Sequence, residues 1–374
     1  MIRRLLPLLT MAAALLMAPG PAQAGPKVVD LTGRTITVPD KVERVILGEG
    51  RAVIALAILD RAEPLARVVG TMGDFPLLDP IGHAKWLKRF PRLGEINAIG
   101  KVAADSFSVE RSIALKPDLA LFSMAGHGPA PKDVEIVKQL EAAGITVAFI
   151  DFFFDPLVNT PKSMELLGTL LGRQAEAAEF NAAYARELTK VTDRVAAITD
   201  RPLVFIENRV GLQAECCASI GNGILGTMVA AAGGRNLASD LIPGYAGTIS
   251  LEYLMTHQPD IYLGTAVGNI DTAAKAPERI VLGHDTPAEL AKSSFARALA
   301  RPGIGRLQAV RQGRAYALWH HFVHSPFNVV AVQVLAQWLH PAHFADLDPA
   351  ATLRELTTRF QPLPLDGVFW TQYP

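Results

Sequence analysis

SVERSIALKPDL at Ser108–Leu119 and SLEYLMTHQPDI at Ser250–Ile261 follow the same pattern in two distant parts of the chain. In each stretch a glutamate, Glu110 or Glu252, lies eight residues before the aspartate of a Pro-Asp pair. A short apolar run follows each pair, which predicts a buried strand. A repeat across this distance indicates two similarly built lobes rather than a short-period solenoid. The two glutamates are therefore expected at equivalent positions, one on each lobe.

Strands and helices alternate on both sides of these repeats. Buried strands are predicted at positions 44–47, 67–69, 119–122, 146–150, 203–206, 261–263 and 315–319. Helices are predicted between them, and the helix at 134–143 ends at Gly144, a typical glycine C-cap. Around Gly33 the alternation of β-branched residues predicts a hairpin. This order predicts an α/β fold of two Rossmann-like lobes with central parallel sheets and a ligand cleft between the lobes.

A long helical pattern separates the two halves. Apolar residues recur at three- and four-residue steps from Pro161 to about Thr199, and Pro202 lies just beyond the end. Gly168 and Gly172 are expected to weaken this helix without ending it. The pattern predicts a single helix, or nearly one, that bridges the lobes.

The N-terminus has the composition of a secretory signal peptide. Charged residues precede an apolar run, and Ala22-Gln23-Ala24 fits a small-x-small cleavage site, so the mature chain is expected to begin at Gly25. The run is short for a membrane span, and no cysteine follows that could carry a lipid. We therefore expect an exported, periplasmic protein, with an uncleaved membrane anchor as the alternative.

The expected organisation follows from these segments: a signal peptide at 1–24, an N-terminal α/β lobe at 25–156, a bridging helix at 157–200, a C-terminal α/β lobe at 201–345, and an extension at 346–374 that packs on the surface. A chain of 374 residues is long enough for two cores. Its formal net charge of zero argues against a strongly basic nucleic-acid-binding surface.

Two further runs, AGGRN at 232–236 and GRAYA at 313–317, complete a recognisable set of motifs. With the two lobes, the bridging helix and the paired glutamate phrases, they resemble the periplasmic substrate-binding proteins of ABC importers. The similarity is closest to the class that carries ferric siderophores, haem and cobalamin, and it covers roughly Val28 to Leu339. The resemblance implies a monomeric receptor that delivers a small-molecule metal chelate to an inner-membrane ABC permease dimer. It implies no nucleic-acid partner and no cofactor other than the cargo.

In that family one glutamate of each lobe docks on arginines of the two permease subunits, and the resemblance carries this role to Glu110 and Glu252. An exposed ion pair contributes only about 0.2–1 kcal/mol. Two such contacts would therefore orient the receptor on a two-fold partner without trapping it. The alternative is that both glutamates simply occupy the first turn of a helix, where negative charge is favourable.

Ligands of open α/β sheets bind beyond the carboxyl ends of the strands. The candidates that follow predicted strands or lie in cleft loops are Arg51, Met72, Met124 and Phe153 in the first lobe, and Arg209, Tyr245, Trp319, His320 and His321 in the second. The two arginines are favoured because their planar fork suits carboxylate or hydroxamate oxygens. Structural ion pairs of Arg51 with Glu49, and of Arg209 with Glu207, are the alternative.

Phe153 belongs to a run of three phenylalanines, 152–154. Side chains alternate along a strand, so only part of this run can reach the cleft. Core packing is the simpler interpretation of the run.

The histidines at 320, 321 and 324 raise the question of a metal site. His321 and His324 are spaced to contact one ion, but Pro326 disfavours helical geometry and a closed zinc site usually has four ligands. We expect a histidine contact with the chelate and no resident metal. Direct capture of zinc or manganese is an alternative.

Cys216 and Cys217 are the only cysteines. Adjacent cysteines form a disulfide only with strain, so no disulfide framework is expected. Two small buried side chains are the simplest interpretation, and a soft-metal or redox role is the alternative.

Hydrolase signatures such as Gly-x-Ser-x-Gly and His-Glu-x-x-His do not occur in the sequence. We therefore expect a binding protein and no enzyme, a secreted thiol hydrolase being the alternative. The expected cargo is an iron chelate, a ferric siderophore, with haem or cobalamin as the alternative.

Overall fold

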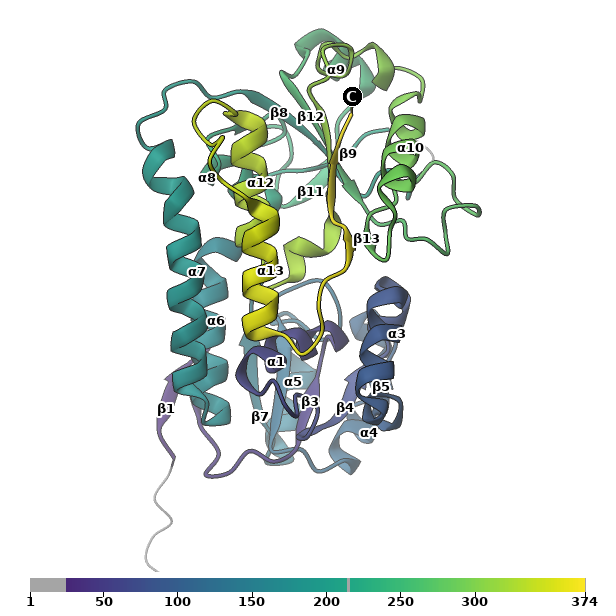
Figure 1. Cartoon of the computed structure of the whole chain (residues 1–374). Coiled ribbons are helices and arrows are strands. Elements are labelled where there is room, and N and C mark those ends of the chain that lie inside the picture. The colour runs from purple at the N-terminus through teal and green to yellow at the C-terminus, as the bar shows by residue number, and fades with distance from the viewer. Residues whose placement is uncertain (1–24, 214–215, 374) are drawn as a thin grey trace, which may run out of the picture.

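The computed structural model describes residues 25–213 and 216–373 and has two α/β lobes. Figure 1 shows the N-terminal lobe at the bottom and the C-terminal lobe above it. The expected signal peptide lies outside the described residues. Within the ranges that are described, no helix is long and apolar enough to cross a membrane.

The N-terminal lobe contains a five-stranded parallel sheet in the order β5-β4-β3-β6-β7. Its strands are β3 (Val45–Leu47), β4 (Val68–Met72), β5 (Asn97–Gly100), β6 (Leu119–Ser123) and β7 (Thr146–Ile150). Its helices are α1 (Val53–Leu59), α2 (Phe75–Leu78), α3 (Pro80–Arg89), α4 (Val109–Ala114) and α5 (Val134–Ala142). All of β3 is buried, which explains why this central parallel strand is a continuous apolar run. The predicted hairpin is formed by β1 (Lys27–Val29) and β2 (Thr35–Thr37).

The C-terminal lobe has a mixed sheet in the order β11-β9-β8-β12-β14-β16, with β10 paired to β8. Its strands are β8 (Leu203–Glu207), β9 (Ala218–Ile220), β10 (Arg235–Asn236), β11 (Ala246–Thr248), β12 (Ile261–Ala266), β14 (Ala315–Trp319) and β16 (Trp370–Gln372). β13 (Gly283–His284) and β15 (Gly367–Val368) form a separate antiparallel pair. The helices are α8 (Leu225–Ala231), α9 (Leu251–His257), α10 (Ala288–Leu299), α11 (Gln308–Arg311) and α12 (Val329–Leu339). The predicted parallel pairing holds for β8, β12 and β14, and β10, which was not predicted, is also parallel to β8. β9, β11 and β16 run antiparallel to their neighbours.

The repeated Pro-Asp pairs have the same structural role in both lobes. Asp118 accepts hydrogen bonds from the backbone N–H groups of Glu43 and Arg44 at 2.7 and 2.8 Å, just before β3. Asp260 accepts one from the N–H of Leu203 at 2.7 Å, at the start of β8. Each aspartate therefore fixes the beginning of the neighbouring central strand, which explains why the phrase recurs.

Two helices, rather than the predicted single helix over 157–200, lie between the lobes. α6 (Pro156–Leu171) ends where Gly172 adopts a φ of +66°, and α7 (Gln174–Val195) packs back against it. Gly172 is thus a left-handed C-cap like Gly144, and the expectation that it leaves the helix intact is wrong. α7 has 22 residues, a length of roughly 33 Å. It is the segment that runs from the lower to the upper lobe in Figure 1.

The extension at 346–374 does more than the predicted packing on the surface. α13 (Pro349–Phe360) packs against α7, α12 and α1, and β16 then extends the sheet of the C-terminal lobe beside β14. Gln361 Nε2 donates a hydrogen bond to the carbonyl of Ile54 at 2.9 Å, so the extension contacts both lobes. The prolines around 362–364 mark a short crossing segment, and the strand beyond it is only three residues long.

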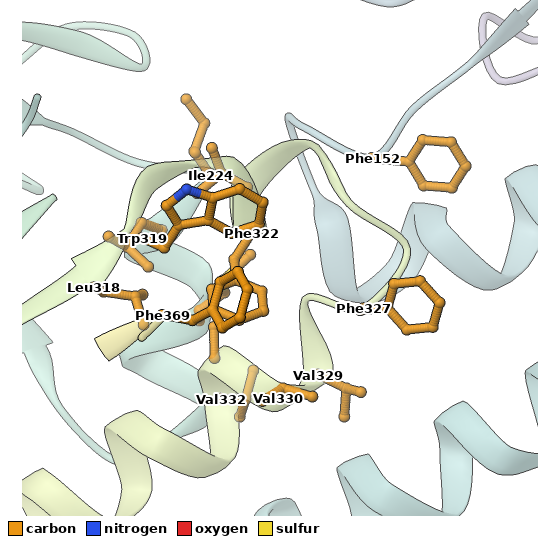
Figure 2. Packing of buried hydrophobic residues seen from close by; sticks show 14 of the residues in the cluster. Phe152, Ile224, Leu318, Trp319, Phe322, Phe327, Val329, Val330, Val332 and Phe369 are labelled. Atoms are coloured by element: carbon orange, nitrogen blue, oxygen red, sulfur yellow. The ribbon is translucent and has the colours of Figure 1, made fainter. Parts of the chain in front are cut away.

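A hydrophobic core continues through both lobes, with a smaller cluster on the other face of the N-terminal sheet. Figure 2 shows the region where Trp319 and Phe322 lie near Phe369 of the extension. Phe180 of α7 contacts Phe360 of α13 edge to face, with ring centroids 5.2 Å apart. Because the connecting segments share this core, a large hinge motion would expose apolar surface, which favours a small closure of the lobes.

The adjacent cysteines are joined in a disulfide, so the interpretation as two separate buried side chains is wrong. Cys217 is fully buried, and Cys216 packs against the main core. In the part of the chain that the structure describes, no disulfide connects two different elements. Packing and hydrogen bonding therefore hold the lobes together.

Candidate ligand-binding cleft

A cavity of about 310 Å³ lies between the lobes. Much of its lining comes from loops that follow the carboxyl ends of strands in both sheets, where ligands of open α/β sheets generally bind. These side chains are Arg51 after β3, His127 after β6, Phe153 after β7, Arg209 after β8, and His320, His321 and His324 after β14. The volume lies at the lower end of the range of about 300–1,000 Å³ for small-molecule sites.

The lining is rich in basic side chains: Arg51, Arg209, Arg279, His127, His320, His321 and His324. No aspartate or glutamate is among the described residues that line this cavity. Burial, followed by the charges of Arg209 and Arg51, lowers the pKa of His320 to about 3. Burial and Arg51 also lower the pKa of the other three histidines. The cavity therefore presents guanidinium charge and neutral imidazoles at neutral pH, which suits an anionic ligand.

Arg51 is only 5% exposed and is fixed by two neighbours. Its Nη1 lies 2.7 Å from Nδ1 of His321, so this imidazole nitrogen acts as the acceptor. Its Nη2 lies 2.6 Å from a carboxylate oxygen of Glu49, although the angles are not those of a hydrogen bond. Since Coulomb attraction depends on distance, this contact is an ion pair. Arg51 therefore forms the ion pair with Glu49 that was the alternative to ligand binding, and it also lines the cavity.

Arg209 has a different environment. Its backbone has a φ of +52°, and its N–H donates to Oγ1 of Thr265 at 2.6 Å, which fixes the position of the residue. Glu207 is instead held by Nη1 and Nη2 of Arg301 at 2.8 and 2.7 Å. The alternative of an Arg209–Glu207 ion pair is therefore wrong, and no other ion pair of Arg209 occurs among the residues described. Its guanidinium is available to a ligand.

The three phenylalanines separate as strand alternation suggests. Phe152 is 9% exposed and belongs to the main core cluster, of which Figure 2 shows a part. Phe153 lines the cavity and stacks on His324, with ring centroids 4.5 Å apart and planes at 18°. Tyr245 stands edge-on to Phe153 at 5.8 Å and is 46% exposed. Core packing therefore describes one member of the run, and Phe153 forms an aromatic wall of the cleft.

Three of the predicted ligand contacts lie outside this cavity. Met72 is fully buried in the core beneath the N-terminal sheet, and Met124 packs against the same cluster. Trp319 is 7% exposed and faces a smaller neighbouring cavity. Its ring centroid is 5.0 Å from that of His321, so it lies one side chain away from the ligand cavity.

Several lining residues were not among the sequence-based candidates. His127 follows β6 in a loop between Gly126 and Gly128, both of positive φ, and this glycine pair is a signal that could have pointed to it. Arg279 and Leu212 lie in irregular C-terminal-lobe segments without a strand pattern. Only the folded chain brings them to the cleft.

Glu110 and Glu252 are both exposed and occupy equivalent positions on the two lobes. Each follows a serine cap in the first turn of a short helix, α4 or α9. Ser108 Oγ accepts a hydrogen bond from the N–H three residues on at 3.2 Å, and Ser250 Oγ does the same at 3.1 Å. Figure 1 places α4 near the lower end of the molecule and α9 at the upper end. A partner that lies along the long axis of the molecule could therefore contact both glutamates, one on each lobe.

Comparison with known proteins agrees with this architecture. The model of a family described as periplasmic binding protein matches residues 86–319. The chain belongs to the periplasmic binding protein family. The predicted fold class and the resemblance to receptors of ABC importers are thereby confirmed.

Individual proteins give the extent of the similarity. Cobalamin-binding proteins from two strains of Halobacterium salinarum are 26% identical over 262 residues, which cover 66% of this chain. The alignment spans 60% of the length of those relatives. The TroA-like periplasmic binding protein FepB from Veillonella parvula is 26% identical and matches 93% of this chain and 99% of its own, with a TM-score of 0.79. The molybdate-binding protein MolA from Haemophilus influenzae, 18% identical, matches 91% of this chain and 99% of its own with a TM-score of 0.67.

Proposed function

We propose that this periplasmic binding protein binds an anionic iron chelate, a ferric siderophore, and delivers it to an ABC permease of the inner membrane. The observation that carries the proposal is the charge of the cleft. Three arginines and four neutral histidines line it, and the described lining contains no carboxylate. Catecholate, carboxylate and hydroxamate oxygens around iron are the acceptors that such a lining would favour.

The cleft has enough polar contacts for useful affinity. A hydrogen bond to a charged group contributes about 1.5–3 kcal/mol. Arg51 is already paired with Glu49, so the other two lining arginines, Arg209 and Arg279, supply roughly 3–6 kcal/mol before any loss of freedom. Micromolar to nanomolar binding requires about 8–12 kcal/mol. Aromatic contact with Phe153 and Tyr245 would supply part of the remainder.

A corrinoid or haem is the second candidate cargo. The cobalamin-binding relatives from Halobacterium salinarum favour a corrinoid. The guanidinium groups of the cavity favour an anionic cargo instead, and MolA, a relative in fold, was crystallised with molybdate, an oxyanion. Direct binding of zinc or manganese has less support, since the described residues contain no group of three or more histidine, cysteine or acidic side chains placed to hold a metal.

Delivery requires a location and a partner. We place the protein in the periplasm as a monomer, with cleavage after Ala24. Glu110 and Glu252 would contact basic residues of a permease dimer, one from each lobe. Their exposure and their equivalent positions on α4 and α9 support this arrangement.

Titration of a ligand panel tests the proposal. Tryptophan fluorescence is a suitable signal because Trp319 lies beside His321 at the cavity wall. The panel contains ferric catecholate and ferric hydroxamate siderophores, haem, cobalamin, molybdate, and free zinc and manganese. We expect saturable quenching by a ferric siderophore at micromolar concentration or below. Quenching by cobalamin or haem alone would replace the proposed cargo with the second candidate.

The Arg209→Ala variant connects the affinity to the cleft. Loss of one charge-assisted contact should weaken binding of the ferric siderophore roughly 10- to 100-fold. Arg235→Ala is the control, because Arg235 is an exposed arginine of the same lobe that does not line the cavity. Equal affinities of both variants and the unaltered protein would contradict an anion-binding role for this cleft.

A further inference from the structure

Exposed apolar side chains gather at the mouth of the cleft. Among the described residues, eight large hydrophobic side chains are exposed, and three of these line the ligand cavity. They are Leu77 at 64%, Leu212 at 43% and Tyr245 at 46% exposure. Single exposed leucines are common on protein surfaces, but a cluster around one cavity indicates a binding surface.

The three side chains come from both lobes. Leu77 lies on α2 of the N-terminal lobe, whereas Leu212 and Tyr245 lie in loops of the C-terminal lobe that follow β8 and precede β11. Tyr245 is held edge-on against Phe153 and Phe154 at 5.8 and 5.5 Å. We call these three side chains the apolar rim. A ligand seated between the lobes would contact the rim from two sides.

The inner part of the same cavity is polar. Arg51 is 5% exposed and His321 is 9% exposed, so both lie below the exposed rim. The cavity therefore has buried guanidinium and imidazole groups inside, and leucine and tyrosine side chains together with the exposed Arg209 at the mouth. A ligand that matches both regions has an acidic part and an apolar part.

We propose that the cargo is amphiphilic: an acidic chelate whose alkyl or aryl substituent covers the apolar rim. This inference rests on the proposed function for the acidic part and adds the apolar substituent. The rim is continuous with the cavity, since its side chains line the same space as the arginines. Contact with the bound ligand therefore explains its exposure more directly than contact with a separate partner.

A series of anionic ferric chelates with the same net charge and increasing apolar length tests the inference. The probes are the ferric tris-complexes of catechol, 4-methylcatechol and 4-butylcatechol, which share the same metal-binding oxygens. Each methylene that the rim buries should raise affinity by about fourfold. We expect the butyl compound to bind at least tenfold more tightly than the parent. Equal affinities across the series would overturn the inference.

The Leu77→Asn, Leu212→Asn double variant assigns the gain to the rim. We expect the double variant to lose the gain in affinity with chain length, where each alkylated complex is compared with the catechol complex bound to the same variant. The control is Leu241→Asn, because Leu241 is 41% exposed and does not line the cavity. A gain that persists in the double variant would refute the assignment. If the double variant binds every chelate normally but fails in transport, the rim contacts the permease and not the ligand, which would also refute the inference.

A metal-free probe separates this inference from the proposed function. Anilinonaphthalene sulfonate combines an acidic group with an apolar ring system and fluoresces when its surroundings are apolar. We expect saturable fluorescence that is lost in the double variant and kept in Leu241→Asn. If no iron complex binds but this pattern appears, the proposed iron cargo is wrong and the amphiphilic site stands. If iron complexes bind but neither rim effect appears, the proposed function stands and the amphiphilic cargo is wrong.

Discussion

Asp74 gives the sharpest test of the electrostatics beside the cleft. Its side chain is fully buried after β4, and one carboxylate oxygen accepts a hydrogen bond from the N–H of Gly50 at 2.7 Å. The other oxygen is buried without a hydrogen-bond partner. This contact fixes the turn that carries Arg51 into the cavity, so the protonation of Asp74 affects a segment close to the ligand.

Burial raises the pKa of Asp74 from 3.8 to about 7, and the negative charge of Glu49 adds to the increase. The hydrogen bond from Gly50 and the charge of Arg51 oppose it. This difference corresponds to roughly 4 kcal/mol. Because the pKa is higher in the folded state, the stabilisation is fully present below pH 3.8 and is lost as pH rises through about 7.

The Asp74→Asn variant removes this titration. We expect the free energy of unfolding of the variant, relative to that of the unaltered protein, to increase by up to roughly 4 kcal/mol between pH 4 and pH 8. Urea unfolding followed by circular dichroism at several pH values measures this difference. The variant is compared with the unaltered protein at each pH because buried neutral histidines such as His320 make both proteins less stable below about pH 6.5. This shared effect cancels in the difference between their unfolding free energies.

Asp105→Asn is the control, since Asp105 is exposed on the N-terminal lobe. Its unfolding free energy should remain parallel to that of the unaltered protein across the same pH range. If the Asp74→Asn difference is also constant to within about 1 kcal/mol, Asp74 does not titrate as its burial indicates and the electrostatic account of this turn is wrong.

Three further variants test the fold and the docking surface. Gly172→Ala should lower the free energy of unfolding in urea by roughly 1–2 kcal/mol, because a φ of +66° is unfavourable for alanine. No atom lies within 4 Å of the new Cβ, so a clash does not contribute. An unchanged unfolding midpoint would show that α6 does not depend on this cap. Arg301→Met should lower it by roughly 3–5 kcal/mol, since Glu207 is 3% exposed and loses a two-point partner, and a loss below about 1 kcal/mol would contradict this. Combined Glu110→Gln and Glu252→Gln substitutions should abolish cellular uptake of the chelate and leave its affinity for the purified receptor unchanged; normal uptake would remove the docking role.

Local patterns in the sequence predicted most of the elements because their signals depend on neighbouring residues. The helix that ends at Gly144 and the hairpin at Gly33 are present with positive φ at both glycines. The same signal at Gly172 was outweighed by the longer apolar pattern, which continues because α6 and α7 bury the same kind of face. The strand β16 was missed because its pairing partner, β14, lies about fifty residues earlier in the chain.

The cleft was predicted less completely, for a related reason. Strand ends indicated Arg51, Phe153, Arg209 and the histidines after β14, all of which line the cavity. Met72 precedes the same edge but points into the core. The orientation of each side chain depends on sheet twist and on what packs above it, and sequence spacing does not contain this information.

The sequence alone determined that two lobes would form, because each strand, cap and Pro-Asp pair is specified by residues close to it in the chain. The tertiary structure decided which arginines keep a free charge. Glu207 pairs with Arg301, 94 residues away in the chain. The guanidinium of Arg209, only two residues from Glu207, therefore remains available to a ligand in the cleft. Arg51 likewise meets His321 across 270 residues. Coulomb attraction depends on distance in space, and only folding sets the distance between groups so far apart in the chain.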